Sequence, residues 1–403
     1  MKLRKYLLAA ACLAAFAPAV AGAQTAASSQ ATAPTPLAHA APYAEHISTP
    51  SRAASVEAGR KRIADYMTQR GVPGLAIAVS VDNVFVWSEG FGLADVEQGV
   101  PVTPSTLFRT GSVAKPMSMA IAARLHDQGK LDFDTPVQKL VPTFPVKSKP
   151  ITFRMLSGML GGLRHYRLGS DDFFNAIKYD NLLGYVDTFK DEPLAYEPGT
   201  KFNYSSPGTN LQGAMTQAAG GKLFPDLAQE LVFEPLGMIH TLPDRNEEII
   251  PYRVRYYERT GGEHTYRIRQ SSWGDGGRGV LLNAPYSDNS NKFASGGYLT
   301  TPEDLVRFGQ AHLAPGFLKA ATLKELFTEQ KTTDGKGTGY GMNWFIDKTP
   351  AGDPIYWHSG SSVGGNSMLL IYPKQNLVLA MQTNLTDSNL KGLPRELAQL
   401  FMK

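Results

Sequence analysis

The amino-acid sequence predicts an α/β fold in which an antiparallel sheet is sandwiched by helices, with an inserted all-α region. A helix and a strand hairpin open the folded part of the chain, and strands followed by a helix close it. Between them, roughly residues 130–330 are rich in loops and short helices. Strands and helices do not alternate regularly, which disfavours a doubly wound parallel sheet.

The first elements follow from apolar periodicity and turn residues. We expect a helix over 52–70, stopped by Gly71, because apolar side chains recur on one of its sides. The apolar run 75–81 predicts a buried strand, Asp82 and Asn83 a hairpin turn, and 84–87 the returning strand.

The later elements are predicted in the same way. A second helix is expected over 112–128 and is closed by Gly129, and Thr301 followed by Pro302 marks the start of another. The end of the chain predicts strands at 355–357, 368–372 and 377–382 and a short helix at 393–401.

The N-terminus has the pattern of a cleaved secretion signal. Three basic residues precede the apolar stretch 6–20, and the small residues 21–23 match a signal-peptidase site. A buried N-terminal helix and a lipoprotein anchored at Cys12 are weaker interpretations. Removal of 1–23 lowers the formal net charge from +4 to +1 and takes away the single cysteine. We therefore expect a cysteine-free protein in a bacterial periplasm or outside the cell.

Composition bounds the rest of the chain. Residues 24–50 are rich in Ala, Ser, Thr and Pro and predict a disordered linker, and 51–403 predict one folded domain. With 42% hydrophobic residues among 403, a multi-span membrane protein and a mostly disordered chain are both excluded.

Ser112 and Lys115 form the first motif that can carry chemistry, at the start of the predicted helix 112–128. Residues three apart share a helix face, so the amine lies beside the hydroxyl. A desolvated lysine has a lowered pKa and can take the proton of a serine nucleophile. Ser388 and Lys391 repeat the spacing in a polar stretch, where we interpret it as chance.

Tyr204 belongs to the second motif, a polar and aromatic loop over 197–206. A phenol acts as a general base when a cation lowers its pKa, and Lys115 is a candidate for that cation. The alternative is a half-buried tyrosine that only packs.

His358 and the glycines after it form the third motif, interpreted as a turn before a strand. Glycine allows close approach to the backbone, and an N–H here, with that of Ser112, suits an oxyanion hole. The alternative is a structural histidine. Ser362 between Gly360 and Gly364 also matches a nucleophile elbow, but no histidine follows it, so we reject an α/β-hydrolase.

Other classes of site find little support. The histidines have no metal-ligand spacing, so we predict neither a metal site nor a cofactor. Arg253, Arg255 and Arg259 alternate with tyrosines and acidic residues, and we interpret them as a solvated strand face rather than a nucleic-acid site.

The three motifs in this order resemble the serine β-lactamase and penicillin-binding superfamily, in its class C, esterase and D-peptidase branch. The resemblance covers about residues 55–400. Segments at 86–90, 94–97, 129–132 and 163–166 are most similar to the mitochondrial β-lactamase-like serine proteases and their bacterial relatives.

The resemblance implies the serine β-lactamase/transpeptidase-like fold and a role for each motif residue. Ser112 matches the acylated nucleophile, Lys115 its activating partner, and Tyr204 the general base of the Tyr-x-Asn element. His358, Ser359 and Gly360 match the Lys-Thr-Gly strand, followed by Ser361 as the second oxyanion N–H. The substrate-binding positions would be Ser206, Ser359 and Gly360.

Two positions depart from the family pattern. Ser206 stands where Tyr-x-Asn has the asparagine that, in the lactamases, contacts the substrate amide and the lysine, so this contact is in doubt unless Asn210 reaches in. His358 stands where Lys-Thr-Gly has lysine, so binding of a β-lactam carboxylate should weaken, because histidine is mostly neutral near pH 7.5.

We therefore expect an exported serine hydrolase that cleaves peptide, amide or ester bonds through an acyl-enzyme on Ser112, with at best weak β-lactamase activity. The alternatives are a class C-like β-lactamase and a non-catalytic protein that binds cell-wall peptides. No nucleic-acid partner and no stable membrane span are expected.

Overall fold

A computed structural model describes residues 47–167, 174–259, 279–390 and 392–402, and all structural statements below refer to them. Their centre is an 8-stranded antiparallel sheet with the order β1-β3-β2-β13-β12-β11-β10, in which β4 pairs with β3. A 3-stranded sheet, β5-β9-β6, and a 2-stranded sheet, β7-β8, lie outside it. The predicted fold class is confirmed.

The strands of the large sheet are β1 (Ile47–Ser48), β2 (Gly74–Val81), β3 (Val84–Asp95), β4 (Val100–Pro101), β10 (Phe345–Lys348), β11 (Pro354–Ser362), β12 (Gly365–Tyr372) and β13 (Leu377–Thr383). The small sheets contain β5 (Phe108–Arg109), β6 (Leu242–Pro243), β7 (Tyr257–Arg259), β8 (Leu281–Asn283) and β9 (Tyr298–Thr300).

The α-helices are α1 (Ala53–Arg70), α2 (Ala114–Asp127), α3 (Val137–Leu140), α4 (Phe153–Ser157), α5 (Leu182–Val186), α6 (Ser206–Gly220), α7 (Phe224–Ala228), α8 (Pro302–Gln310), α9 (Ala320–Leu326) and α10 (Leu393–Gln399). Short turns of other helix types are η1 (Pro50–Arg52), η2 (Gly111–Val113), η3 (Gln229–Phe233) and η4 (Ser290–Lys292).

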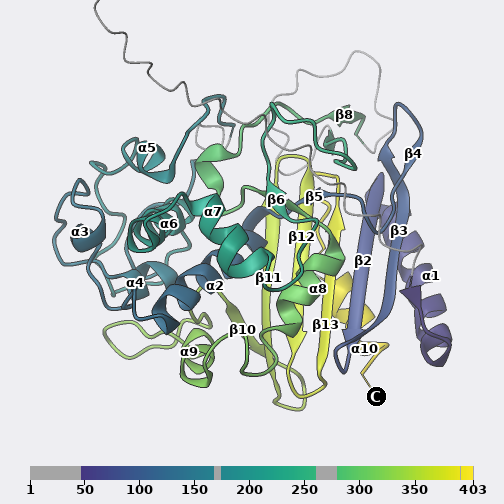
Figure 1. Ribbon diagram of the computed structural model, residues 1–403. Helices are drawn as coiled ribbons and strands as arrows, with labels where there is room; N and C mark the ends of the chain where they lie inside the picture. The colour runs from purple at the N-terminus through teal and green to yellow at the C-terminus, as the bar shows by residue number, and fades with distance from the viewer. Residues whose placement is uncertain (1–46, 168–173, 260–278, 391, 403) are drawn as a thin grey trace, which may run out of the picture. The chain divides into compact units, whose positions relative to one another are not determined.

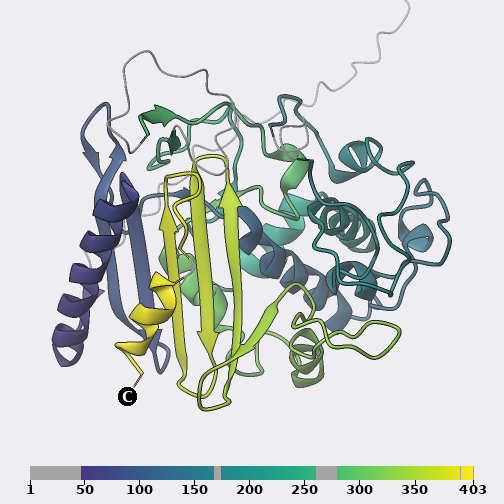
Figure 2. The same ribbon diagram turned by 180° about the vertical axis from the view of Figure 1, so that it is seen from behind.

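Helices cover both faces of the sheet, which explains the unbroken apolar runs of its central strands. Figure 1 shows α8 in front of the sheet, and Figure 2 shows α1 and α10 on the opposite face. Alternate residues of one strand point to opposite faces. In β13, Leu379 packs into the core under α1 and α10, while its neighbours Val378 and Ala380 pack into the core shared with α2, α6 and α8.

The predicted N-terminal elements are present with small shifts. The helix α1 ends at Gly71, which has the left-handed φ of 62°. Asp82 and Asn83 have φ of 53° and 61°, as a tight hairpin turn between β2 and β3 requires. The returning strand β3 runs on to Asp95, beyond the four residues expected.

Three expectations need correction. Ile47 and Ser48 were assigned to the linker, yet they pair with Ser88 and Trp87, so sheet structure begins before residue 51. The residue pattern at 358–362 predicted a turn, but this segment continues β11 and forms five of its seven residue pairs with β12, as the resemblance to the Lys-Thr-Gly strand implied. The sheet partner explains this, because a glycine-containing segment becomes a strand where its backbone pairs.

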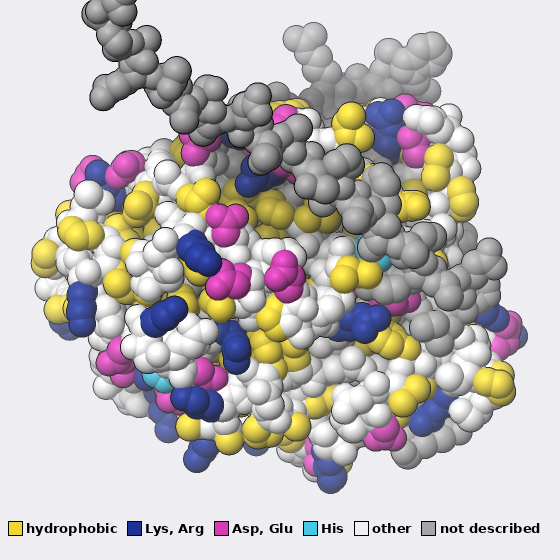
Figure 3. All heavy atoms as spheres, in the orientation of Figure 1, with side chains coloured by type: hydrophobic (Ala, Val, Ile, Leu, Met, Phe, Trp, Pro, Cys, Tyr) yellow, Lys and Arg dark blue, Asp and Glu magenta, His cyan; other side chains and the backbone are white. Residues whose placement is uncertain are grey.

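The third correction concerns the arginine-rich segment 253–259, which is not a solvated strand face. Tyr257 and Glu258 are buried in β7, and Arg253 lies near the buried Asp244. Only Arg255 is well exposed, and it pairs with Asp95. On the face in Figure 3, basic and acidic side chains of the described residues are interspersed.

Candidate active site

Ser112 lies in the turn η2, directly before α2, where the chain passes close to β11. Gly111 has a φ of 47°, and a Cβ there would lie 2.8 Å from both N and O of Ser361. Only glycine satisfies both the left-handed backbone and this close approach. The predicted helix therefore begins with a tight turn that presents Ser112 to the edge of the sheet.

Lys115 follows three residues later, and its side chain is fully buried. Its Nζ lies 3.0 Å from Ser112 Oγ, 3.0 Å from Ser206 Oγ and 3.0 Å from Ser295 O. Burial holds the pKa of Lys115 well below its usual range. None of the three contacts is a carboxylate that would stabilise the ammonium form, so the amine is held ready as a base.

The three contacts suit a neutral amine, which has two N–H donors and one lone pair. Ser295 O accepts only, so it takes one N–H, and Ser206 Oγ can take the other. In the ammonium form Lys115 Nζ donates to Ser112 Oγ; in the neutral form its lone pair is left for the Ser112 hydroxyl to donate to. This geometry lets the Ser112 proton pass to Lys115 as the oxygen attacks a carbonyl.

Tyr204 lies in the loop before α6, which is capped by the Ser205 hydroxyl accepting from Gly208 N–H. Lys115 Nζ lies 4.9 Å from the centroid of the Tyr204 ring. Withdrawal of the phenol from water raises the pKa of Tyr204, and a hydrogen bond with Ser112 only partly opposes this. The expected lowering by a cation is therefore wrong, because the neighbouring lysine is itself desolvated and the ring face, not the hydroxyl, meets it.

The edge of β11 supplies the second wall. Its neighbour β10 pairs only with residues 354–357, so 358–362 face η2 with a free edge. A Cβ on Gly360 would lie 2.1 Å from Thr110 O and 3.0 Å from Ser112 N. Gly360 thus approaches the turn that carries Ser112, and Gly111 of that turn approaches Ser361, so η2 and β11 are in direct contact beside both backbone N atoms.

His358 lines the cavity but has both ring nitrogens occupied. Nδ1 lies 2.7 Å from Ser359 O, and Nε2 lies 3.1 Å from Tyr340 Oη. Burial, together with the nearby Lys115, lowers the pKa of His358 to about 3. The register with Leu369 turns this side chain toward the helical core, so it forms a neutral wall rather than a cation facing substrate.

A cavity of about 350 Å³ opens above these residues. Every residue that the sequence assigned to the site contributes to its lining except Lys115 and Gly360, which lie behind it. Further lining residues that the motifs did not reveal are His165, Tyr166, Asn289, Lys292, Ser295, Gly296, Phe345, Ser362, Val363 and Asp387.

His165 and Tyr166 contact the two residues that hold the Lys115 amine, from the helical side of the cavity. Tyr166 Oη lies 3.0 Å from Ser295 Oγ and accepts from Asn210 Nδ2 at 3.1 Å. His165 Nδ1 accepts the Ser206 N–H at 3.2 Å. Asn210 therefore reaches Tyr166 instead of Lys115. In the sequence, only the family-like segment 163–166 pointed to His165 and Tyr166. Ser295 could not be found from its residue type, because its contact to Lys115 is made by a backbone carbonyl.

The remaining motifs do not form sites. Ser388 is buried and hydrogen bonds to Asn366 and Thr383, and Lys391 lies outside the described residues. Within the described ranges, no group of three or more metal-ligating side chains is found. Cys12 and the proposed leader also lie outside these ranges. In the same part of the chain, no helix has the length and apolarity of a membrane span.

A sequence model described as Beta-lactamase matches residues 60–400. The chain belongs to the β-lactamase family. The predicted resemblance is thereby confirmed, and the chain is a serine hydrolase of this family.

Two curated relatives extend the comparison. The chain is 30% identical over 433 residues to the serine beta-lactamase-like protein LACTB, mitochondrial, of Bos taurus, covering 83% of this chain and 74% of the relative. It is 28% identical over 332 residues to penicillin-binding protein 4 of Amycolatopsis lactamdurans, covering 79% and 82%.

A solved structure shares the fold. It is the D-amino acid amidase from Ochrobactrum anthropi SV3 in complex with L-phenylalanine amide, with a TM-score of 0.71, 22% identity and coverage of 86% of this chain and 97% of the amidase. The antiparallel sheet with its helical region is thus the fold of this serine hydrolase family.

Proposed function

We propose that this β-lactamase-family protein is an exported hydrolase that cleaves peptide, amide or ester bonds through an acyl-enzyme on Ser112. One observation carries the proposal: the buried Lys115 amine lies 3.0 Å from Ser112 Oγ and is held by two neutral oxygen partners. A desolvated amine in that position is a base, and a serine beside it is a nucleophile.

The reaction begins when Ser112 Oγ attacks the substrate carbonyl and its proton passes to Lys115 Nζ. The carbonyl oxygen gains negative charge, which the N–H groups of Ser112 and Ser361 stabilise. Tyr204, whose raised pKa keeps it protonated, donates to the departing nitrogen or oxygen. Water then attacks the ester on Ser112 and gives a proton to the Tyr204 phenolate, while the Lys115 ammonium returns its proton to Ser112 Oγ as the acyl group leaves.

Neutral substrates fit the cavity better than β-lactams. The side chain in the place of the family's Lys-Thr-Gly lysine is the neutral His358, which offers no charge to a carboxylate. Phe345 stacks against Trp357 and lies 6.3 Å, between ring centroids, from Tyr204, which gives an aromatic wall for an apolar acyl group. An amidase of the same fold, the D-amino acid amidase of Ochrobactrum anthropi SV3, favours amides among the proposed substrates.

The test is labelling with a fluorophosphonate, followed by mass spectrometry and a substrate panel. We expect one adduct on Ser112 and none in Ser112→Ala, with hydrolysis of a peptide or ester at least about a hundredfold faster than nitrocefin. Faster nitrocefin hydrolysis would favour the class C-like β-lactamase. An unlabelled Ser112 with retained peptide binding would favour the non-catalytic cell-wall peptide-binding protein.

Export is the second part of the proposal and rests on residues 1–23. The basic start, the apolar stretch and the small residues at 21–23 support cleavage by a signal peptidase. N-terminal sequencing of the protein from a fractionated bacterial host should find a periplasmic chain that begins near residue 24. A cytoplasmic chain that retains residues 1–23 would contradict export and leave the hydrolase proposal standing.

A further inference from the structure

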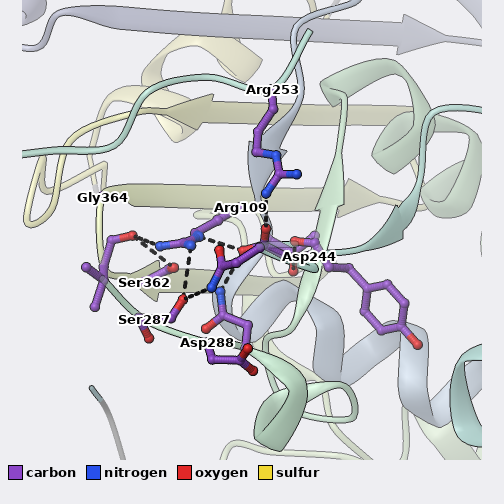
Figure 4. Close-up of polar contacts among 12 residues, drawn as sticks. Arg109, Asp244, Arg253, Ser287, Asp288, Ser362 and Gly364 are labelled. Atoms are coloured by element: carbon purple, nitrogen blue, oxygen red, sulfur yellow. Dashed lines mark hydrogen bonds and ion pairs between the residues drawn. The ribbon is translucent and has the colours of Figure 1, made fainter. Parts of the chain in front are cut away.

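Arg109 lies outside the catalytic set, three residues before Ser112, and is almost completely buried. Its guanidinium donates to three different segments, as Figure 4 shows. Nε donates to Asp244 Oδ2 at 2.7 Å, Nη1 to Val363 O at 2.8 Å and Nη2 to Ser287 O at 3.4 Å.

The contact with Val363 holds the turn between β11 and β12, two residues after Ser361. Tyr256 contacts both this turn and the guanidinium. Arg109 lies 3.7 Å from the centroid of the Tyr256 ring, and a Cβ on Gly364 would lie 2.2 Å from Tyr256 Cβ. The turn thus contacts both members of a stacked pair, the Arg109 guanidinium and the Tyr256 side chain.

The contact with Asp244 extends the network to the cavity wall. Asp244 Oδ2 also accepts from Asn289 Nδ2 at 2.6 Å, and Asn289 lines the cavity. Asp244 Oδ1 lies 3.6 Å from Arg253 Nη1. One buried carboxylate therefore joins Arg109 to the loop that precedes Ser295, the residue whose carbonyl holds Lys115.

A guanidinium is planar and presents its donors in a fixed fork, so its partners are held at fixed relative positions. Arg109 is joined to η2 by its own backbone, to the β11–β12 turn through Val363 and to the cavity loop through Ser287 and Asp244. We propose that Arg109 is a positioning residue that holds the N–H of Ser112 and the N–H of Ser361 at the spacing required by the oxyanion. This inference rests on the proposed acyl-enzyme function.

Arg109→Lys is the direct test, because lysine keeps the charge beside Asp244 but lacks the fork. The fraction of competent sites is counted first by fluorophosphonate labelling of Ser112. A merely structural role would lower this fraction and leave the rate per labelled site unchanged. For a positioning role, we expect kcat per labelled site to fall by about a hundredfold, as for a small misplacement of reacting groups, with KM within about threefold.

Phenylboronic acid supplies a second readout. Ser112 Oγ adds to its boron, and a boronate oxygen then occupies the oxyanion position. We expect the inhibition constant to rise by the same factor by which kcat/KM falls, because both depend on the same two N–H groups. An inhibition constant that stays at the wild-type value would overturn the positioning role.

Two further variants complete the design. Arg60→Lys makes the same substitution at an arginine that pairs with Glu89 on the opposite side of the sheet, and the rate per site should not change. Asp244→Asn removes the carboxylate partner of Arg109 and should also lower kcat. It therefore serves as the test if the Arg109→Lys protein does not fold. Activity in Ser112→Ala would reject the acyl-enzyme itself, whereas wild-type rates per site in both Arg109→Lys and Asp244→Asn would reject the positioning role alone.

Discussion

Ser206 Oγ lies 3.0 Å from Lys115 Nζ, so a serine makes the contact to the lysine that the family's Tyr-x-Asn element makes through asparagine. The departure that appeared to remove this contact in the sequence preserves it in the structure. Serine is shorter than asparagine, and the contact is made because Ser206 begins α6 beside the buried amine.

Loss of the Ser206 hydroxyl should slow acylation. Ser206→Ala leaves the Lys115 amine with one partner fewer, and a hydrogen bond of this kind contributes about 1 kcal/mol, which corresponds to a rate about fivefold to tenfold lower. The burst phase with a nitrophenyl ester measures this rate. Ser206→Thr, which keeps the hydroxyl, should recover most of it. Ser80→Ala, at a buried hydroxyl remote from the site, is the control, and an equal loss there would contradict a specific role.

Tyr204 should matter most where the leaving group needs a proton. In Tyr204→Phe we expect a loss of about 10²-fold with an anilide, because general acid catalysis contributes about 10²–10⁴-fold. With a nitrophenyl ester of the same acyl group, the loss should be below about tenfold, since nitrophenolate departs without protonation. Rates of acylation with the paired substrates check this. Equal losses for the two would assign Tyr204 to the base and not to the acid.

The acid limb of the pH–rate profile should report Lys115. Its amine is active only when neutral, and its pKa lies well below the usual range, so activity is present at high pH and is lost as protonation of the amine sets in. His358 has a pKa of about 3 and stays neutral there. Profiles of kcat/KM for the wild type and His358→Gln should therefore share the same acid limb. A limb that moves in this variant would show that His358 titrates in the active protein.

Gly111 and Gly129 form a matched pair that tests whether the close approach of Gly111 to Ser361 matters for catalysis. Both have left-handed backbones, with φ of 47° and 73°, but only Gly111 has neighbours near the Cβ position. Alanine at either site should cost about 1–2 kcal/mol of unfolding free energy from backbone strain. Gly111→Ala should also lower kcat by more than about tenfold, because a 1 Å misplacement can cost 10²-fold. Urea unfolding and steady-state rates measure the two effects, and unchanged kcat in Gly111→Ala would refute the second.

The buried His312 should make stability depend on pH. Burial lowers its pKa from 6.5 to about 4, and its Nδ1 lies 2.8 Å from Phe308 O. Below pH 6.5 the unfolded chain binds a proton that the folded chain does not, so stability is full above pH 6.5 and falls toward pH 4 by about 1.4 kcal/mol per pH unit.

Urea unfolding of His312→Gln at pH 7, 6 and 5 isolates this contribution. The variant should lose less stability per pH unit than the wild type, while His165 and His358 keep part of the dependence. An identical pH dependence in the two proteins would show that His312 does not contribute.

Turns and helix ends were predicted correctly from the residues next to them. The turn at Asp82 and Asn83, the stop at Gly71 and the cap at Thr301 depend on neighbours within four residues, and each appears in the structure as expected. The residue pattern alone missed the strand at 358–362, which only the family resemblance implied, because its pairing partner, β12, begins after a turn that the glycines obscured. Tyr204 was given the wrong pKa direction because desolvation depends on surroundings that the loop sequence does not contain.

The sequence by itself determined the order of the motifs and, from the order of the predicted elements, the fold class. Through the family resemblance it also predicted Ser112, Lys115 and Tyr204 as the reacting groups. Only the tertiary structure decided that the Lys115 amine is desolvated beside Ser112, that Ser206 contacts this amine, that both ring nitrogens of His358 have partners and that Arg109 joins three segments around the cavity. Burial and distances between segments far apart in the chain govern those properties, because a pKa and a hydrogen bond depend on everything packed around a group.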